Sequence, residues 1–139
     1  MSRPVSTWQH RLFLAAAVSA VLLGAACRPK ADTANEFTVE REFTPLPMYV
    51  GAVRVTFTVW DRASKPVEGA HISVEADMTH AGMSPIFAEA KEIEPGRYQA
   101  DLALGMAGDW VILLHGTLAS GEKLERQFDV KGVEPRILN

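Results

Sequence analysis

Residues 53–60, VRVTFTVW, alternate apolar and polar side chains with a period of two. This alternation is typical of a β-strand with one buried face, because successive side chains of a strand point to opposite sides. Val53, Val55, Phe57 and Val59 are therefore expected to share the buried face. The stretch predicts a sheet protein with a packed interior.

Similar strand patterns recur along the rest of the chain, separated by turn sequences such as Glu94-Pro95-Gly96. No helical period follows residue 50. The chain is therefore expected to be all-β, an immunoglobulin-like antiparallel β-sandwich of about six or seven strands preceded by a signal peptide. Beyond the first strand, the expected strands lie at residues 70–78, 86–93, 97–104, 110–116 and 124–130.

The N-terminal segment has a different composition from the rest of the chain. Residues 12–26, LFLAAAVSAVLLGAA, are an unbroken apolar run that follows Arg3 and Arg11. The run is short for a permanent membrane-spanning helix, and its order of basic, apolar and small residues is that of a secretory signal peptide. Residues 1–26 are accordingly expected to be a lipoprotein signal peptide.

Cys27, the only cysteine, follows this run directly. A cysteine with no partner is unusual in an exported protein, so covalent modification is a simpler use for it than a free thiol. Residues 22–27, LLGAAC, resemble the lipobox of bacterial lipoproteins, although Gly24 stands where leucine is common. We expect lipidation of Cys27 and a lipid anchor in the periplasm, and Arg28, in place of aspartate, slightly favours the outer membrane. Ordinary cleavage without lipidation is the alternative.

The mature chain is expected to be acidic. The whole chain has 14 basic and 17 acidic residues, and removal of residues 1–26 takes away two arginines, which leaves a net charge of −5. This charge disfavours nucleic acid as a partner. Residues 27–49 have mixed charge and three prolines and are expected to form a flexible tether, in which EFTVEREF (36–43) could add an edge strand. Residues 50–131 would be the domain and 132–139 a C-terminal tail.

Antiparallel order places every second connection at the same end of a sandwich. The loop DMTHAGMSP (77–85) and the turn GMAG (105–108) should therefore lie at one end. Met48, beside the tether, would reach the same end and is expected to pack in the core. The residues that could form a site at this end are Met78, His80, Met83 and Met106.

Thioether sulfur is a soft donor and neutral imidazole a borderline one, so this donor set suits Cu(I) better than Zn²⁺, Ca²⁺ or Mg²⁺. Methionine also keeps its donor in an oxidising compartment, where cysteines form disulfides. Copper is therefore the expected cofactor. Met78 and Met106 have an alternative role, because both continue the inward parity of their strands and could cap the core.

The remaining polar residues give little support to catalysis. No Ser-His-Asp, Cys-His or paired-carboxylate arrangement falls in one loop region, and Asp77 and Asp109 are expected to be turn caps or solvated groups. His71 should be a solvated strand residue, and His115 a partly buried, hydrogen-bonded one. The chain is not expected to be an enzyme.

The segments KPVEGA (65–70), PGRYQADL (95–102) and MAGDW (106–110) are similar, in order and spacing, to the YtkA-like/FixH-like domain of bacterial exported proteins. The resemblance covers nearly all of residues 50–131. It implies an immunoglobulin-like β-sandwich and an association with copper handling or cytochrome oxidase assembly. The family's methionine-rich loop corresponds to Met78, His80 and Met83, and its MAG.W element to Met106 and Trp110.

Two functions follow from these patterns. The first is a membrane-tethered periplasmic module that binds Cu(I) and passes it to copper efflux or oxidase-assembly proteins. The alternative is a metal-free immunoglobulin-like interaction module of an envelope complex, whose methionine-bearing loop docks a partner through adaptable apolar contacts.

Overall fold

The computed structural model describes residues 36–80 and 82–137. They form seven strands, and all strand pairs are antiparallel. In this part of the chain no helix is long and apolar enough to cross a membrane. The strands are β1 Phe37–Thr44, β2 Gly51–Asp61, β3 His71–Met78, β4 Ile86–Glu94, β5 Arg97–Leu104, β6 Gly108–Thr117 and β7 Lys123–Val133.

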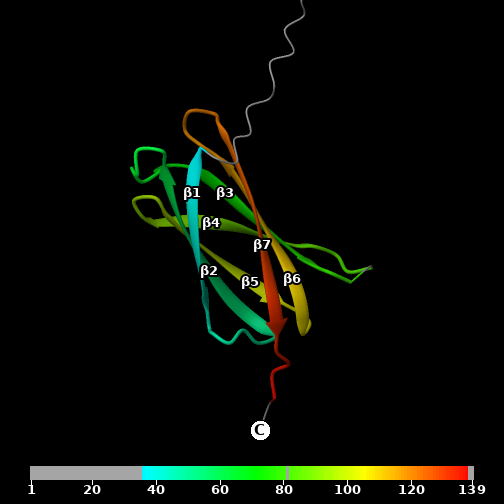
Figure 1. Cartoon of the computed structure of the whole chain (residues 1–139). Helices are drawn as coiled ribbons and strands as arrows, with labels where there is room; N and C mark the ends of the chain where they lie inside the picture. Colours follow the sequence, from blue (N-terminus) through cyan, green and yellow to red (C-terminus); the bar gives the residue numbers. More distant parts are fainter. Residues whose placement is uncertain (1–35, 81, 138–139) are drawn as a thin grey trace, which may run out of the picture. The chain divides into compact units, whose positions relative to one another are not determined.

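The strands follow the order β1-β2-β5-β4-β3-β6-β7 and make two layers (Figure 1). β4 belongs to both layers: residues 86–90 pair with β3, and residues 91–94 pair with β5. One layer is thus β1, β2, β5 and the end of β4, and the other is the start of β4 with β3, β6 and β7. This arrangement confirms the immunoglobulin-like sandwich.

The core comes from the inward positions of both layers. Val53, Val55, Phe57 and Val59 of β2 are at most 1% exposed, as their alternation predicts. They meet inward residues of β3, β5, β6 and β7. The largest of these partners that are fully buried are Ile72, Tyr98, Leu102, Leu104, Trp110, Ile112, Leu114 and Leu124.

The folded domain is longer than the expected range of 50–131. Within residues 27–49, where a tether with a possible edge strand at 36–43 was expected, β1 is that edge strand, and its Phe37, Val39 and Phe43 pack against the core. At the other terminus the N–H of Val50 donates to the carbonyl of Glu134 at 2.8 Å. The expected boundaries at residues 50 and 131 are therefore too narrow, since the strands run from Phe37 to Val133. The sequence pattern did not show this because an edge strand with few apolar residues is recognised by its packing.

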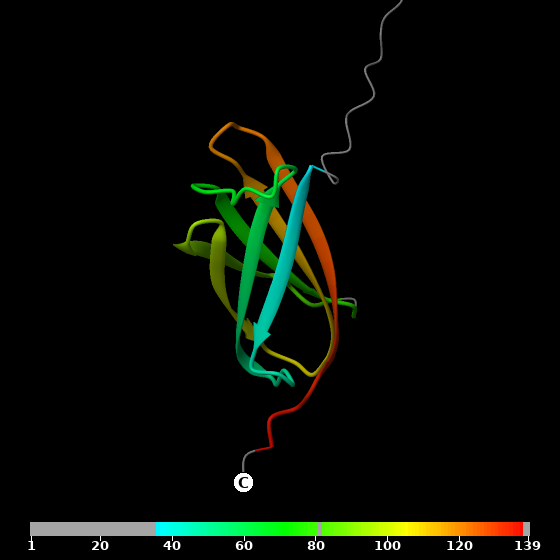
Figure 2. The same ribbon diagram turned by 60° about the vertical axis from the view of Figure 1, so that its left-hand side comes forward.

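β1 and β7 are the two ends of the strand order, and they lie side by side (Figures 1 and 2). The guanidinium of Arg126 donates to the carbonyl of Phe37 at 2.6 Å, and the guanidinium of Arg41 lies 4.6 Å from the ring centroid of Phe128. Partial burial lowers the pKa of Arg126. These side chains join the two layers where no backbone ladder does.

The six connections fall at two ends of the sandwich, which are named here by their most informative residues. The Tyr98 end consists of residues 62–70, 95–96 and 118–122. The methionine end consists of residues 45–50, 79–85 and 105–107, together with residues 134–137 that follow β7. In Figure 1 the Tyr98 end is at the top, and the loop 79–85 extends to the right.

Candidate functional site at the methionine end

Met78 is the last residue of β3 and pairs with Trp110 of β6. Its side chain is partly buried and packs against the core, which confirms that it points inward, as the alternation along the strand predicted. The methyl group of Met78 also reaches the turn after β5: a Cβ atom placed on Gly108 would lie 3.1 Å from it. Glycine at 108 therefore leaves room for this thioether beside the turn.

Met106 lies in the turn between β5 and β6. Its side chain is 46% exposed, so the core role suggested by its strand parity is wrong. The indole N–H of Trp110 donates to the carbonyl of Met106 at 3.1 Å, while the Trp110 side chain is buried. The buried indole thus holds the backbone of the turn and leaves the thioether of Met106 in solvent.

The loop after β3 presents two further candidate ligands. His80 is exposed and the side chain of Met83 is 40% exposed. The start of the loop is tied to β6, because the backbone N–H and hydroxyl of Thr79 donate to the carbonyl of Asp109 at 3.3 and 3.4 Å. Beyond this attachment the loop extends away from the sandwich (Figures 1 and 2).

Asp109 takes part in the fold at this end. Its carboxylate accepts the backbone N–H of Gly132 at 3.0 Å and pairs with the Lys131 ammonium at 3.1 Å. These two partners, in that order, hold the pKa of Asp109 below its usual range, and the nearby His80 acts in the same direction. The carboxylate is thus engaged in joining β6 to β7, in line with the expected cap role.

The topology brings all four candidate ligands to one end of the sandwich, as predicted. Met78 and the Met106 turn are joined through Gly108 and Trp110, whereas His80 and Met83 belong to the projecting loop. Among the described residues no group of three or more histidine, cysteine, aspartate or glutamate side chains could hold a metal ion. A metal site at this end would therefore depend on the thioethers. The ligand role of the four residues stays a prediction, and Cys27 lies outside the described residues.

Sequence reasoning missed two apolar residues at the same end. Leu46 and Ile137 are 72% and 82% exposed. The sequence TPLPM (44–48) carries a signal for Leu46, since prolines on both sides separate it from any strand pattern. Met48 of the same segment is 9% exposed and belongs to the core, which confirms its expected packing role.

The histidines outside this end have the expected structural roles. His115 is partly buried, and its Nε2 lies 3.2 Å from a carboxylate oxygen of Glu75. His71 is exposed and lies 3.3 Å from Glu89. Neither histidine belongs to the methionine end.

The model of the YtkA-like family matches residues 31–115 of this chain, more than half of its length. None of the curated proteins matches it.

Two solved structures match the chain at low sequence identity. A DUF4426 family protein from Pseudomonas aeruginosa PAO1 is 16% identical with a TM-score of 0.57, over 74% of this chain and 94% of that protein. The soluble domain of PmoD from Methylocystis sp. ATCC 49242 is 13% identical with a TM-score of 0.44, over 70% of this chain and 90% of that domain. At 16% identity, the likeness to the DUF4426 family protein concerns the fold alone.

Proposed function

The chain belongs to the YtkA-like family, and from this premise we propose that it is a metal-binding module that carries Cu(I) at the methionine end. The observation that carries the proposal is the pair of solvent-exposed thioethers, Met83 and Met106, on two loops of one end. Contact of an apolar methionine side chain with water is unfavourable, and these two side chains have no packing role there. Soft sulfur, in contrast, is a preferred ligand of Cu(I).

The donor set fits copper as cargo. Met78 lies beside the turn that carries Met106, and the imidazole of His80 is exposed on the neighbouring loop. Two or three thioethers with one imidazole favour Cu(I) over hard cations. A projecting loop can approach a fixed turn, so the ion would be held by one rigid and one adjustable element. Such a site suits delivery to an efflux or oxidase-assembly protein better than catalysis, and we propose no enzymatic activity.

Titration with Cu(I) against a competing chelator tests this proposal, with the chain from residue 28 onward. We expect about one ion per chain and preference over Zn²⁺. Met83→Leu, Met106→Leu and His80→Ala should each weaken Cu(I) binding at least tenfold, about 1.4 kcal/mol. His71→Ala, which removes an exposed histidine elsewhere, is the matched control and should leave the affinity unchanged.

Leucine is chosen because it keeps the apolar volume of methionine and removes the sulfur. Absence of Cu(I) binding by the wild-type chain, or equal affinities in all variants, would reject the copper proposal.

The second candidate function is a metal-free interaction module, and a specific observation favours it. Six large apolar side chains are highly exposed among the described residues, and four of them, Leu46, Met83, Met106 and Ile137, lie at the methionine end. Clustered exposed apolar groups mark docking surfaces. In this case Met83→Leu would preserve partner binding, while Met83→Ser would weaken it.

The proposed location is the periplasm, with the chain anchored through a lipid on Cys27. This rests on the single cysteine that follows the apolar run of residues 12–26. Cells fed a labelled fatty acid should incorporate it into the wild-type protein and not into Cys27→Ser, which should also leave the membrane fraction or accumulate unprocessed. A wild-type protein without label would reject the anchor and leave the copper proposal intact.

A further inference from the structure

The outer face of the layer formed by β4, β3, β6 and β7 gathers residues from four strands in register. Across these strands Glu89 lies in one row with Ser73, His115 and Glu125, and Phe87 lies in the next row with Glu75, Leu113 and Gln127. Asp77, Val111 and Asp129 form a third row. We call these three rows the acidic face. All of its members point away from the core, because their strand neighbours are the buried residues.

The acidic face has an unbalanced charge. It carries the five carboxylates of Glu75, Asp77, Glu89, Glu125 and Asp129. The next row along the strands adds a single ammonium, that of Lys123, which donates to the hydroxyl of Thr117 at 2.7 Å. The other contacts of these carboxylates are with His115, His71 and the amide of Gln127. The cation Arg126 also lies at this surface, beside Glu125. With neutral histidines the surface therefore holds a net charge of about −3, from five carboxylates and two cations.

The outer face of the other layer is different, because three of its carboxylates are paired with arginines. Arg54 pairs with Asp101 at 2.8 Å, and Arg97 pairs with both Glu42 and Glu94 at 3.1 Å. Glu40 of β1 is an exposed carboxylate of that face outside these pairs. Carboxylates without an arginine partner are therefore more numerous on the acidic face.

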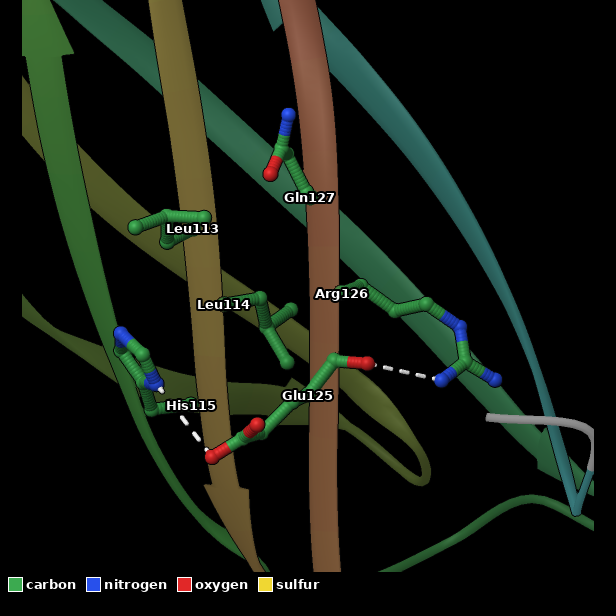
Figure 3. Close-up of a pocket in the computed structure, with 6 residues that line it drawn as sticks. All are labelled: Leu113, Leu114, His115, Glu125, Arg126 and Gln127. Atoms are coloured by element: carbon green, nitrogen blue, oxygen red, sulfur yellow. Dashed lines mark hydrogen bonds and ion pairs between the residues drawn. The ribbon is translucent and has the colours of Figure 1, made fainter. Parts of the chain in front are cut away.

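The acidic face also has an apolar centre. Phe87 is 67% exposed, and Leu113, two strands away in the same row, is partly exposed, as is Val111. Beside Leu113 the surface has a shallow depression, lined also by Leu114, His115, Glu125, Arg126 and Gln127 (Figure 3). Phe87 itself lies two strands from this depression. Exposed apolar side chains on one face are a feature of contact surfaces, and the surrounding carboxylates determine which partner suits them.

We propose that the acidic face is a docking surface for a basic protein segment, one that places apolar side chains against Phe87 and Leu113 and lysine or arginine side chains against the surrounding carboxylates. Charge complementarity selects this occupant, since the face offers five carboxylates against the two cations of Lys123 and Arg126. A second copy of the chain is disfavoured, because two such faces would repel each other. The proposal does not rest on copper binding, which concerns the methionine end.

A synthetic peptide that alternates lysine with valine is a suitable probe, tested by fluorescence anisotropy with the full-length chain in non-ionic detergent. We expect saturable binding that weakens as salt rises from about 0.05 to 0.3 M. A peptide that alternates glutamate with valine should not bind, and one that alternates lysine with serine should bind more weakly.

Matched variants locate the contact. Phe87→Ser and Glu125→Lys should each weaken binding of the lysine–valine peptide about five- to tenfold. Leu46→Ser, an exposed apolar residue at the methionine end, and Glu40→Lys, an exposed carboxylate on the other layer, should change the affinity less than twofold. Circular dichroism should give the same folded spectrum for all four variants.

Several outcomes would overturn the proposal. The first is a lack of saturable binding by the wild-type chain. The second is equal weakening by Glu40→Lys and Glu125→Lys, which would mean attraction by net charge alone. The third is an unchanged affinity in Phe87→Ser. Copper titration of the same variants should be unaffected, so the two proposals fail independently.

Discussion

The Tyr98 end and the methionine end each contain three strand connections, yet their loops are held in different ways. At the Tyr98 end the hydroxyl of Tyr98 donates to the carbonyl of Val67 at 2.7 Å and accepts the N–H of Ala70 at 3.0 Å. Burial is the main cause of the raised pKa of Tyr98. This tyrosine fixes the loop between β2 and β3 from inside the domain.

A second residue joins the same loops. The two carboxylate oxygens of Glu92 accept the N–H groups of Gly96 and Gly69, at 3.0 and 2.9 Å. A Cβ atom on Gly96 would lie 2.8 Å from the Cβ of Pro66. The loop 62–70 and the turn 95–96 therefore form one packed unit.

At the methionine end the corresponding side chains are left in solvent. Met83 and Met106 are 40% and 46% exposed, and the loop 79–85 has its attachment at Thr79. Trp110 is buried beside this turn, and it holds the backbone of the turn rather than the side chain of Met106.

The segments that resemble the YtkA-like family fall into two kinds, according to the end of the sandwich at which they lie. KPVEGA and PGRY lie at the Tyr98 end, where contacts within the fold account for their residues. MTHAGM and MAGDW lie at the methionine end, where the fold accounts for Gly108 and Trp110 but not for the exposed thioethers. Residues that packing leaves unexplained are the better candidates for function.

The largest effect is expected from Gly96→Ala. Gly96 has φ +71°, a conformation that costs an L-residue about 1–2 kcal/mol, and the added methyl group would meet Pro66 and the carbonyl of Val59 at 2.8 and 3.0 Å. With overpacking added, we expect a loss of about 3 kcal/mol in the free energy of unfolding. Urea denaturation measures it.

Gly69→Ala is the control for this substitution. Gly69 has a similar φ of +66°, but no atom lies within 4 Å of an added Cβ. The Gly69→Ala variant should lose only the backbone cost, about 1–2 kcal/mol in the free energy of unfolding. If both alanine variants lose the same stability, the close packing at the Tyr98 end does not contribute.

The smallest effect is expected from Met83→Ala and Met106→Ala. Both side chains are largely in solvent, so each substitution should change the free energy of unfolding by less than about 0.5 kcal/mol. Met48→Ala, the buried methionine near the same end, is the reference substitution, with an expected loss of about 2 kcal/mol because Met48 is still 9% exposed. A loss above about 1 kcal/mol in Met106→Ala would show that its thioether packs in the fold and would weaken the contrast between the two ends.

Several features of the fold were predictable because they depend on local pattern. The period of two along β2 identified its buried face, and the turn at Glu94-Pro95-Gly96 separated β4 from β5. Antiparallel alternation then placed the loops of Met83 and Met106 at one end, which the strand order confirms. These inferences needed no contact between distant residues.

Other features depend on distant partners. The strand β1 was expected only as a possible edge strand within the tether, since three of its eight residues are charged, and its place is set by its ladder with β2 and by the contact of Phe37 with Arg126. The exposed side chain of Met106 departs from its strand parity, because β5 ends at Leu104 and the turn is held by the indole of Trp110.

By itself, then, the sequence determined the class of the fold, the inward faces of its central strands and the grouping of its methionines, because side-chain period and antiparallel order are local rules. Tertiary structure alone decided that the domain starts at Phe37, that Met78 is partly buried while Met106 is exposed, and that five carboxylates surround Phe87 and Leu113 on one face. Strand order and register decide such features, and they are set by packing between segments far apart in the chain.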